Sequence, residues 1–355
     1  MSQTLYDHSG PAPAPRESTL SARDLRVWYG TERGPVRAVD GVSFDVWPGE
    51  TLGLVGESGC GKSTLGRGLL GLLPEGAGTS GQVRYRGENM LEMSPGELRG
   101  LRGPDLGLVF QEPMTRLNPL MRISDQFMET LRVHEPELSK AEVRHRALDT
   151  LRAMGIPPTR FRSYPHEFSG GMRQRIMIAL ALVLRPSFVV ADEPTTSLDV
   201  LVEAQILRIL ADLRASFDTA LVLITHNLGI VAEACDRVAV MYAGQIVETG
   251  PADQVFAEPS HPYTRELLAS TISLSTTGLR YIPGAPPDLA APPSGCRFHP
   301  RCPDAMRVCA EQEPVEVTDA SGTRVACWLH GPDDQVPDGG REPLEQEEIG
   351  VAEEA

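Results

Sequence analysis

The feature that most constrains the fold of this chain is the octapeptide GESGCGKS, which spans Gly56 to Ser63 and fits the pattern GxxxxGK[ST]. It follows a short apolar run, LGLV, and precedes a stretch compatible with a helix, which is the strand–loop–helix context that the pattern requires. Glycines let such a loop curl closely around an anion, and the following helix offers its positive N-terminus. We therefore predict a binding site for phosphate groups. An ordinary glycine-rich turn is the alternative.

Within this loop, two side chains have chemistry suited to ATP and Mg²⁺. Lys62 is placed to reach the β- and γ-phosphates, and Ser63 is placed to bind Mg²⁺. Cys60 is interpreted either as a small residue that fills space in the loop or as a thiol whose oxidation would inhibit ATP binding. The predicted nucleotide contacts are the loop and the residue after it, namely Gly56, Glu57, Ser58, Gly59, Cys60, Gly61, Lys62, Ser63 and Thr64.

A second apolar run begins at Phe188 and ends in two adjacent carboxylates, Asp192 and Glu193. Asp192 would hold the Mg²⁺ shell, and Glu193 would polarise the water that attacks the γ-phosphate. Taken alone, this run is only weak support for a catalytic Mg²⁺ site, because strands often end in acidic residues for solubility. Its weight depends on the motifs that accompany it.

Short strand-like runs recur along the chain at residues 51–55, 106–110, 188–191 and 221–225, with helical patterns between them. This alternation predicts an α/β fold with a largely parallel sheet flanked by helices. Residues 112–184 have an almost wholly helical pattern and predict a helical subdomain inserted into that core. Residues 238–242 and 245–248 flank Ala243-Gly244 and predict a hairpin.

The chain is predicted to have four parts. Residues 1–19 form a disordered, Pro/Ala-rich leader, residues 20–260 form the α/β unit, and residues 261–330 form an irregular, Pro-rich module. Residues 331–355 form an acidic tail with nine acidic residues and one arginine. We expect this tail to be disordered because its charge is solvated.

Charge and hydropathy exclude two classes of function. The formal net charge of −15 argues against a protein whose main role is to bind nucleic-acid phosphates, so no nucleic-acid partner is expected. No run approaches the roughly 18 uninterrupted apolar residues that a membrane helix needs, and the leader lacks the apolar segment of a secretory signal. We expect a chain that stays in the cytoplasm and does not itself cross a bilayer.

Further motifs accompany the two candidate elements in a fixed order. Gln111 ends the run LGLVF, SGGM at 169–172 opens a helical pattern, Asp199 follows Glu193, and His226 ends the run LVLIT. With these motifs the chain resembles the ATP-binding-cassette (ABC) ATPases over residues 20–330. The resemblance implies a phosphate-loop cassette with a RecA-like parallel sheet core, an antiparallel β part and an inserted helical subdomain, which hydrolyses ATP·Mg²⁺.

The resemblance also implies a role for each matching residue. Tyr29, or its neighbour Trp28, would stack on the adenine. Gln111 would contact Mg²⁺ or the attacking water, and His226 would contact the γ-phosphate. Asp199 would reach across a dimer in which the signature of one subunit caps the γ-phosphate bound by the other, so two cassettes must close for hydrolysis. That signature consists of Ser169, Gly170, Gly171 and Met172.

Several segments resemble one branch of the family, the dipeptide and oligopeptide importers, and more closely their D-type than their F-type ATPase. These are VGESGCGKST, FQEPMTRLNPL, YPHEFSGGMRQR, HPYTRELL and IPGAPPDL. The resemblance implies a second ATPase of the F type, two integral-membrane permeases and an extracytoplasmic substrate-binding protein, with this chain at the cytoplasmic face of the membrane. A nickel or other solute importer is the alternative within the branch; an exporter subunit or a soluble regulatory ATPase lies outside it.

Four of the six cysteines cluster near the end of the chain, at Cys296, Cys302, Cys309 and Cys327. In a reducing compartment such a cluster suggests a metal before disulfides. The gaps are looser than those of structural zinc sites, which favours a [4Fe-4S] cluster, and relatives with this pattern are linked to such a cluster. Zinc and unliganded buried thiols are the alternatives. None of the four lies in a nucleotide motif, so we expect ATP binding to survive loss of the cluster.

Overall fold

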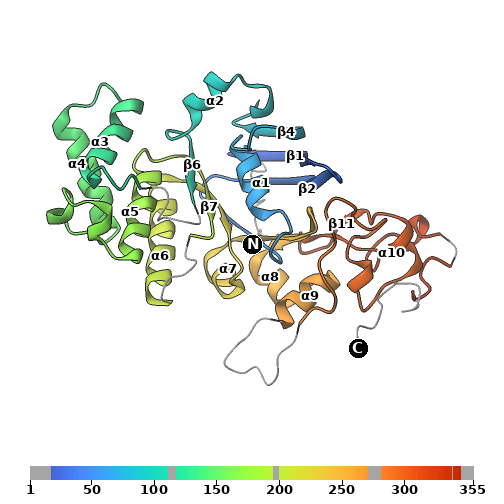
Figure 1. The fold of residues 1–355 in the computed structure, drawn as a ribbon. Helices are drawn as coiled ribbons and strands as arrows, with labels where there is room; N and C mark the ends of the chain where they lie inside the picture. The colour runs from blue at the N-terminus through green and yellow to red at the C-terminus, as the bar shows by residue number, and fades with distance from the viewer. Residues whose placement is uncertain (1–16, 111–116, 195–199, 271–280, 338, 345–355) are drawn as a thin grey trace, which may run out of the picture.

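The structure is a computed structural model of the 355-residue chain, and it describes residues 17–110, 117–194, 200–270, 281–337 and 339–344. Two predicted site residues, Gln111 and Asp199, lie outside these ranges, as do most of the predicted leader and the end of the acidic tail. A central sheet has helices α3 to α6 on one side and the described residues from 261 onward, here called the C-terminal segment, on the other (Figure 1). This is the α/β fold that the alternating pattern predicts.

The large sheet has eight strands among the described residues, in the order β11-β12-β10-β9-β3-β8-β7-β6. The five from β9 to β6 run parallel to one another. Every residue of β3, β7 and β8 is buried, as expected for parallel strands covered on both faces. The parallel strands are β3 (Thr51–Val55), β6 (Leu106–Val109), β7 (Phe188–Asp192), β8 (Ala220–Ile224) and β9 (Arg237–Tyr242).

A tight turn at Ala243 and Gly244 joins β9 to the antiparallel strand β10 (Gln245–Pro251). Both turn residues have positive φ, 46° and 87°, which is the conformation of a two-residue hairpin turn whose twist matches that of its strands. The carbonyl oxygen of Ala243 accepts a hydrogen bond from Nη1 of the buried Arg297 at 2.5 Å. The C-terminal segment therefore helps to hold this turn.

A second, antiparallel sheet of order β2-β1-β4-β5 packs on helix α1 (Lys62–Leu69). Leu25 and Val27 of this sheet are buried in one cluster with Leu65 and Leu69 of α1. Helix α2 (Pro95–Leu101) follows the sheet. The strands are β1 (Leu20–Thr31), β2 (Gly34–Val46), β4 (Ala77–Tyr85) and β5 (Glu88–Asn89).

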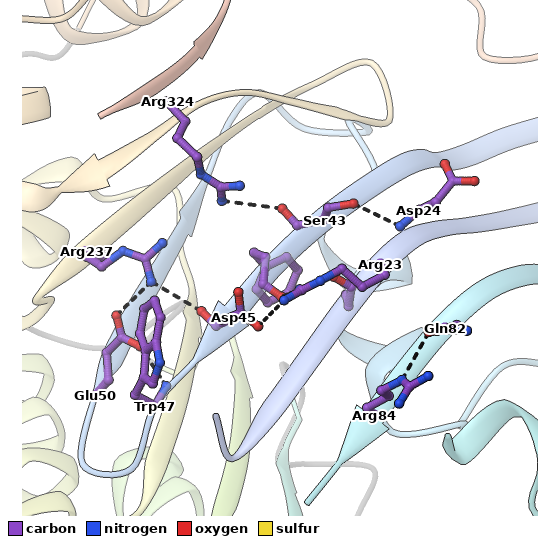
Figure 2. Close-up of polar contacts among 12 residues, drawn as sticks. Arg23, Asp24, Ser43, Asp45, Trp47, Glu50, Gln82, Arg84, Arg237 and Arg324 are labelled. Carbon is purple, nitrogen blue, oxygen red and sulfur yellow. Dashed lines mark hydrogen bonds and ion pairs between the residues drawn. The ribbon is translucent and has the colours of Figure 1, made fainter. Parts of the chain in front are cut away.

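Arginine side chains from the large sheet reach across to the antiparallel sheet (Figure 2). Arg237 of β9 donates to Oε1 of Glu50 at 3.1 Å and to the carbonyl oxygen of Asp45 at 3.2 Å. Arg324, from the C-terminal segment, lies 3.5 Å from the carbonyl oxygen of Ser43. These contacts fix the two sheets relative to each other.

Helices fill the described part of residues 112–184, where the sequence has a helical pattern. Helix α4 begins with a capping box between Ser139 and Glu142. One fully buried side chain from each of three helices, Phe127, Leu151 and Ile176, belongs to a shared core that α6 and α7 also join. The three helices are α3 (Ile123–His134), α4 (Lys140–Ala153) and α5 (Gly170–Leu182), and the two later ones are α6 (Val200–Phe217) and α7 (Leu228–Ala234). In the described ranges no helix has the length and apolar character needed to span a bilayer.

The C-terminal segment extends the large sheet. Strand β12 (Arg324–Ala326) pairs antiparallel with β10, and β11 (Glu316–Thr318) pairs with β12. Phe298 packs against Tyr242 and Tyr263, with ring centroids 5.2 and 5.3 Å apart. The segment is thus largely irregular in backbone but has an aromatic core in common with the preceding sheet. Helix α8 (Ala252–Ala257) precedes the segment, whose own helices are α9 (Pro262–Ala269) and α10 (Arg307–Glu311).

Candidate functional site

Residues 56–63, here called the phosphate loop, leave β3 and enter α1, and two positions in this loop require glycine. Gly56 and Gly61 have φ of 150° and 107°. An added Cβ would lie 2.1 Å from the carbonyl oxygen of Met241 at the first position and 2.0 Å from that of Ala38 at the second. Neither site has room for a side chain, so the curl of the loop depends on these glycines.

Lys62 is the first residue of α1, and its ammonium group lies within the phosphate loop. Nζ donates to the carbonyl oxygens of Gly56 and Glu57 at 2.8 and 2.9 Å, and the residue is 7% exposed. The cation is therefore already positioned for a phosphate bound in the loop. The Cys60 sulfur lies 3.7 Å from Nζ, and burial raises the pKa of this thiol. A raised pKa disfavours the reactive thiolate, which supports the interpretation of Cys60 as a filler.

Two of the three predicted Mg²⁺ ligands, Ser63 and Asp192, are in direct contact, and the third, Gln111, lies outside the described residues. Oγ of Ser63 donates to Oδ1 of Asp192 at 2.9 Å. Asp192 is the last residue of β7 and pairs with Ile224 of β8, while Leu54 of β3 pairs with Ile224 from the other side. Burial raises the pKa of Asp192, and the hydrogen bond from Ser63 opposes that shift. A hydroxyl and a carboxylate oxygen at this position fit the oxygen ligands that Mg²⁺ prefers.

Glu193 and His226 follow β7 and β8 and lie beside each other. Nδ1 of His226 is 3.7 Å from Oε1 of Glu193. Glu193 has φ of 47°, and its backbone N–H donates to the carbonyl oxygen of Ile224 at 2.9 Å. A left-handed conformation at a residue with a Cβ is costly and is often found at functional sites. The two residues predicted to act on the attacking water and the γ-phosphate are thus together at the ends of adjacent strands.

Tyr29 and the signature, also predicted to bind ATP, lie on different elements. The Tyr29 hydroxyl donates to Oγ1 of Thr64, at 3.3 Å, so this aromatic ring is beside the start of α1. Ser169 caps α5, accepting a hydrogen bond from the N–H of Met172 at 3.4 Å, and Gly170 is exposed with open space around it. In Figure 1, β6 and β7 separate α5 from α1. The signature thus opens a different helix from the one that follows the phosphate loop.

Two residues that contact the phosphate loop were not predicted. The hydroxyl of Tyr263 accepts a hydrogen bond from the backbone N–H of Glu57 at 2.9 Å. The Arg301 guanidinium forms an ion pair with the Glu57 carboxylate at 2.7 Å. Tyr263 lies in the segment HPYTRELL, which marks the importer branch in the sequence, so a signal existed for it. Arg301 lies in an irregular, Pro-rich stretch without any local pattern that could have indicated this contact.

Among the C-terminal cysteines, Cys296 packs against two apolar clusters, one that Cys302 also contacts and one that contains Cys309. The backbone N–H of Cys296 donates to the carbonyl oxygen of Cys309 at 2.8 Å. Burial, followed by the proximity of the other thiols, raises the pKa of Cys296 to about 12, and burial also raises that of Cys327 to about 11. The same causes raise the pKa of Cys302. Among the described residues, however, no group of three or more His, Cys, Asp or Glu side chains is arranged to hold a metal ion.

The fold and the phosphate site define an ATP-binding cassette. Residues 39–196 match the family described as ABC transporter, and residues 247–309 match the oligopeptide/dipeptide transporter C-terminal region. A solved dimeric cassette in a post-hydrolysis state, bound to ADP and Pi, aligns with a TM-score of 0.60 at 25% identity, covering 66% of this chain and 98% of that one.

Curated relatives identify the branch of this class to which the chain belongs. The dipeptide transport ATP-binding protein DppD of Bacillus subtilis is 46% identical over 319 residues, covering 88% of this chain and 95% of its own length. The oligopeptide transport ATP-binding protein OppD of Salmonella typhimurium is 46% identical over 329 residues, covering 92% and 98%. The chain belongs to this family of oligopeptide/dipeptide ABC transporter ATP-binding subunits, which confirms the resemblance seen in the sequence.

Proposed function

We propose that this protein binds ATP·Mg²⁺ and hydrolyses it to power the import of dipeptides or oligopeptides. The observation that carries this function is the alignment of β3, β7 and β8, which brings Lys62, Ser63, Asp192, Glu193 and His226 to one end of the sheet. The relatives are named dipeptide and oligopeptide transport ATP-binding proteins, and these names support the peptide cargo.

The proposed mechanism is positioning plus charge stabilisation, because transfer of a phosphoryl group to water needs no covalent intermediate. Lys62 and the backbone of the phosphate loop bind the phosphates, and Ser63 with Asp192 holds Mg²⁺, whose charge neutralises that on the phosphate oxygens. Glu193 polarises the attacking water, and His226 contacts the γ-phosphate.

Four further roles follow from the family resemblance. Tyr29 or Trp28 stacks on the adenine. Gln111 and Asp199, which lie outside the described residues, contact the Mg²⁺ shell and the opposite subunit respectively. Ser169 and Gly170 at the exposed start of α5 offer backbone N–H groups to the γ-phosphate of a second cassette, as a helix N-terminus can.

The proposed assembly contains an F-type ATPase as that second cassette, two integral-membrane permeases and an extracytoplasmic substrate-binding protein. This chain would sit at the cytoplasmic face of the membrane without entering it. Its exposed signature supports this arrangement, since a phosphate bound in another chain can approach it.

We expect the isolated chain to hydrolyse ATP slowly and the assembled transporter to turn over about 10²-fold faster, which is the typical contribution of preorganised donors to developing charge. The measurement is phosphate release by the chain alone and by proteoliposomes that contain the permeases and the F-type ATPase. The same vesicles should accumulate a labelled oligopeptide when the binding protein is present. Uptake of Ni²⁺ without uptake of peptide would contradict the proposed cargo.

A pair of glycine variants sharpens this test. Gly170→Asp places a carboxylate where the partner's γ-phosphate would lie, and we expect it to abolish the stimulation by assembly while the chain still binds ATP. Gly100→Asp in α2 is the matched control, because both glycines lie in a helix with open space around them. Equal stimulation in the two variants, or full activity of the monomer at high dilution, would argue against a shared site.

We further propose that Cys296, Cys302, Cys309 and Cys327 hold a [4Fe-4S] cluster. The packing of these buried or half-buried thiols supports a common ligand, because the backbone N–H of Cys296 donates to the carbonyl oxygen of Cys309, and Cys296 and Cys302 contact the same apolar cluster. A cubane cluster keeps its cysteines farther apart than a single ion does, so this arrangement does not require the tight group that zinc needs.

Protein purified without oxygen is expected to contain about four iron and four acid-labile sulfide atoms per chain, the content of one cubane cluster. Cys302→Ser should lose most of that iron. Cys235→Ser removes a half-buried thiol outside the four and should keep the iron. Metal and sulfide analysis of the three proteins checks this expectation. One equivalent of zinc without sulfide would indicate a zinc site, and no metal at all would indicate packed thiols.

A further inference from the structure

The phosphate loop is tied to the C-terminal segment through Glu57. The carboxylate of Glu57 pairs with Arg301 through two hydrogen bonds, from Nη1 to Oε2 at 2.7 Å and from Nη2 to Oε1 at 3.0 Å. The backbone N–H of the same residue donates to the Tyr263 hydroxyl at 2.9 Å. One residue of the loop is therefore held at both its backbone and its side chain by groups more than 200 positions away.

The Arg301 guanidinium is itself fixed. Nε donates to the carbonyl oxygen of Pro283 at 2.7 Å, Nη2 also donates to that of Ile282 at 3.2 Å, and Nη1 also donates to the Tyr242 hydroxyl at 3.2 Å. Together with the two bonds to Glu57, all five N–H donors of the guanidinium have acceptors. The Arg301 side chain is 4% exposed and that of Glu57 is 24% exposed. An ion pair that is shielded from solvent and held by two parallel hydrogen bonds connects its two residues rigidly.

The link acts directly beside the ammonium group that the phosphates need. The carbonyl oxygen of Glu57 accepts one of the hydrogen bonds from Lys62, at 2.9 Å. A shift of Glu57 would therefore move a group that positions the Lys62 cation. The Glu57 carboxylate would also repel the phosphates of ATP if it lost its countercharge, because both are negative and partly shielded from solvent.

We propose that Arg301 and Tyr263 are positioning residues of the nucleotide site, which set the conformation and charge of the phosphate loop through Glu57. Nucleotide affinity then depends on the C-terminal segment, whereas the sequence predicts only that ATP binding survives loss of the cluster. Arg301 directly precedes Cys302, so any group that holds this cysteine also orders the arginine. The inference rests on the proposed ATP site but not on the transported solute or on the cluster.

The test is calorimetric titration of the full chain with MgADP. Arg301→Gln should weaken binding at least about fivefold, the lower end of typical coupling between two sites. Arg301→Lys should recover part of the lost affinity for MgADP, because lysine restores the positive charge but not the two parallel hydrogen bonds to Glu57. The double variant Glu57→Gln/Arg301→Gln should bind more tightly than Arg301→Gln alone, because the unpaired carboxylate is gone. A purely structural role would not give that recovery.

Two further variants keep the test decisive. Tyr263→Phe retains the ring in its aromatic cluster and removes only the hydroxyl that accepts from Glu57, so it should weaken MgADP binding even if Arg301→Gln folds poorly. Arg265→Gln is the control, because Arg265 pairs with Asp304 on the surface, at 2.6 Å. Wild-type affinity in folded Arg301→Gln and Tyr263→Phe, or no recovery in the double variant, would overturn the proposal. Failure of the wild type to bind MgADP would instead count against the proposed function.

Discussion

Replacing Lys62 with alanine is expected to lower the kcat of ATP hydrolysis by about 10³-fold or more and to abolish ATP-driven uptake. Lys62 brings a buried ammonium group into the phosphate loop, where the backbone already directs it. A single cation placed at the transferred phosphoryl group contributes this much to the rate in phosphoryl transfer, and alanine has nothing to replace it. Steady-state phosphate release and peptide uptake by the assembled transporter measure the effect.

Lys140→Ala is the matched control for that experiment. Lys140 is exposed at the first turn of α4, so its removal changes the net charge equally without touching the loop. Both variants should elute and melt like the wild type, which separates a lost function from a lost fold. Turnover at the wild-type rate in Lys62→Ala would show that the phosphates bind elsewhere.

Replacing Glu193 with glutamine should keep ATP binding and lower hydrolysis by about 10²- to 10⁴-fold, the contribution typical of a positioned base. Glutamine is nearly the same size, so the backbone hydrogen bond to Ile224 and the left-handed conformation can persist. What is lost is the negative charge that polarises water. ATP should then remain bound between closed cassettes, and the variant should accumulate as an ATP-dependent dimer with its partner.

Single-turnover hydrolysis and size-exclusion chromatography with ATP measure the two halves of this prediction. Glu233→Gln on α7 is a suitable control, because this exposed carboxylate lies on the helix that follows the site. If Glu193→Gln hydrolysed ATP as fast as the control, Glu193 would have no role in activating water. If it failed to bind ATP, its role would be in binding instead.

The phosphate loop and the strands around it were predictable because their signals are local. Thr51–Val55 is a continuous apolar run followed at once by the loop, and the structure has a strand with these same bounds. Ser63 and Asp192 are 129 positions apart, yet Ser63 comes after β3 and Asp192 ends β7, and the carboxyl ends of these strands meet on one side of the parallel sheet. Motif order and strand direction together predict that both residues serve one Mg²⁺ site.

The link between Glu57 and Arg301 could not be predicted in the same way. Arg301 lies in a segment with no helical or strand period, and its partner is 244 positions away. Its position depends on carbonyl oxygens of an irregular backbone at Ile282 and Pro283, which no propensity describes. Phe298 and Trp328 of this segment are also buried, without any periodic spacing in the sequence that would indicate it.

The pairing of β12 with β10 has a consequence for any shortened version of this protein. Glu248 of β10 lies opposite Val325, and its fully buried carboxylate accepts backbone N–H groups of Ser260 and His261 at 2.7 and 3.0 Å. A chain cut at residue 260 would leave β10 as an open edge strand and uncover this carboxylate. Open edges template the addition of strands from other chains. The C-terminal segment thus also protects the cassette from aggregation.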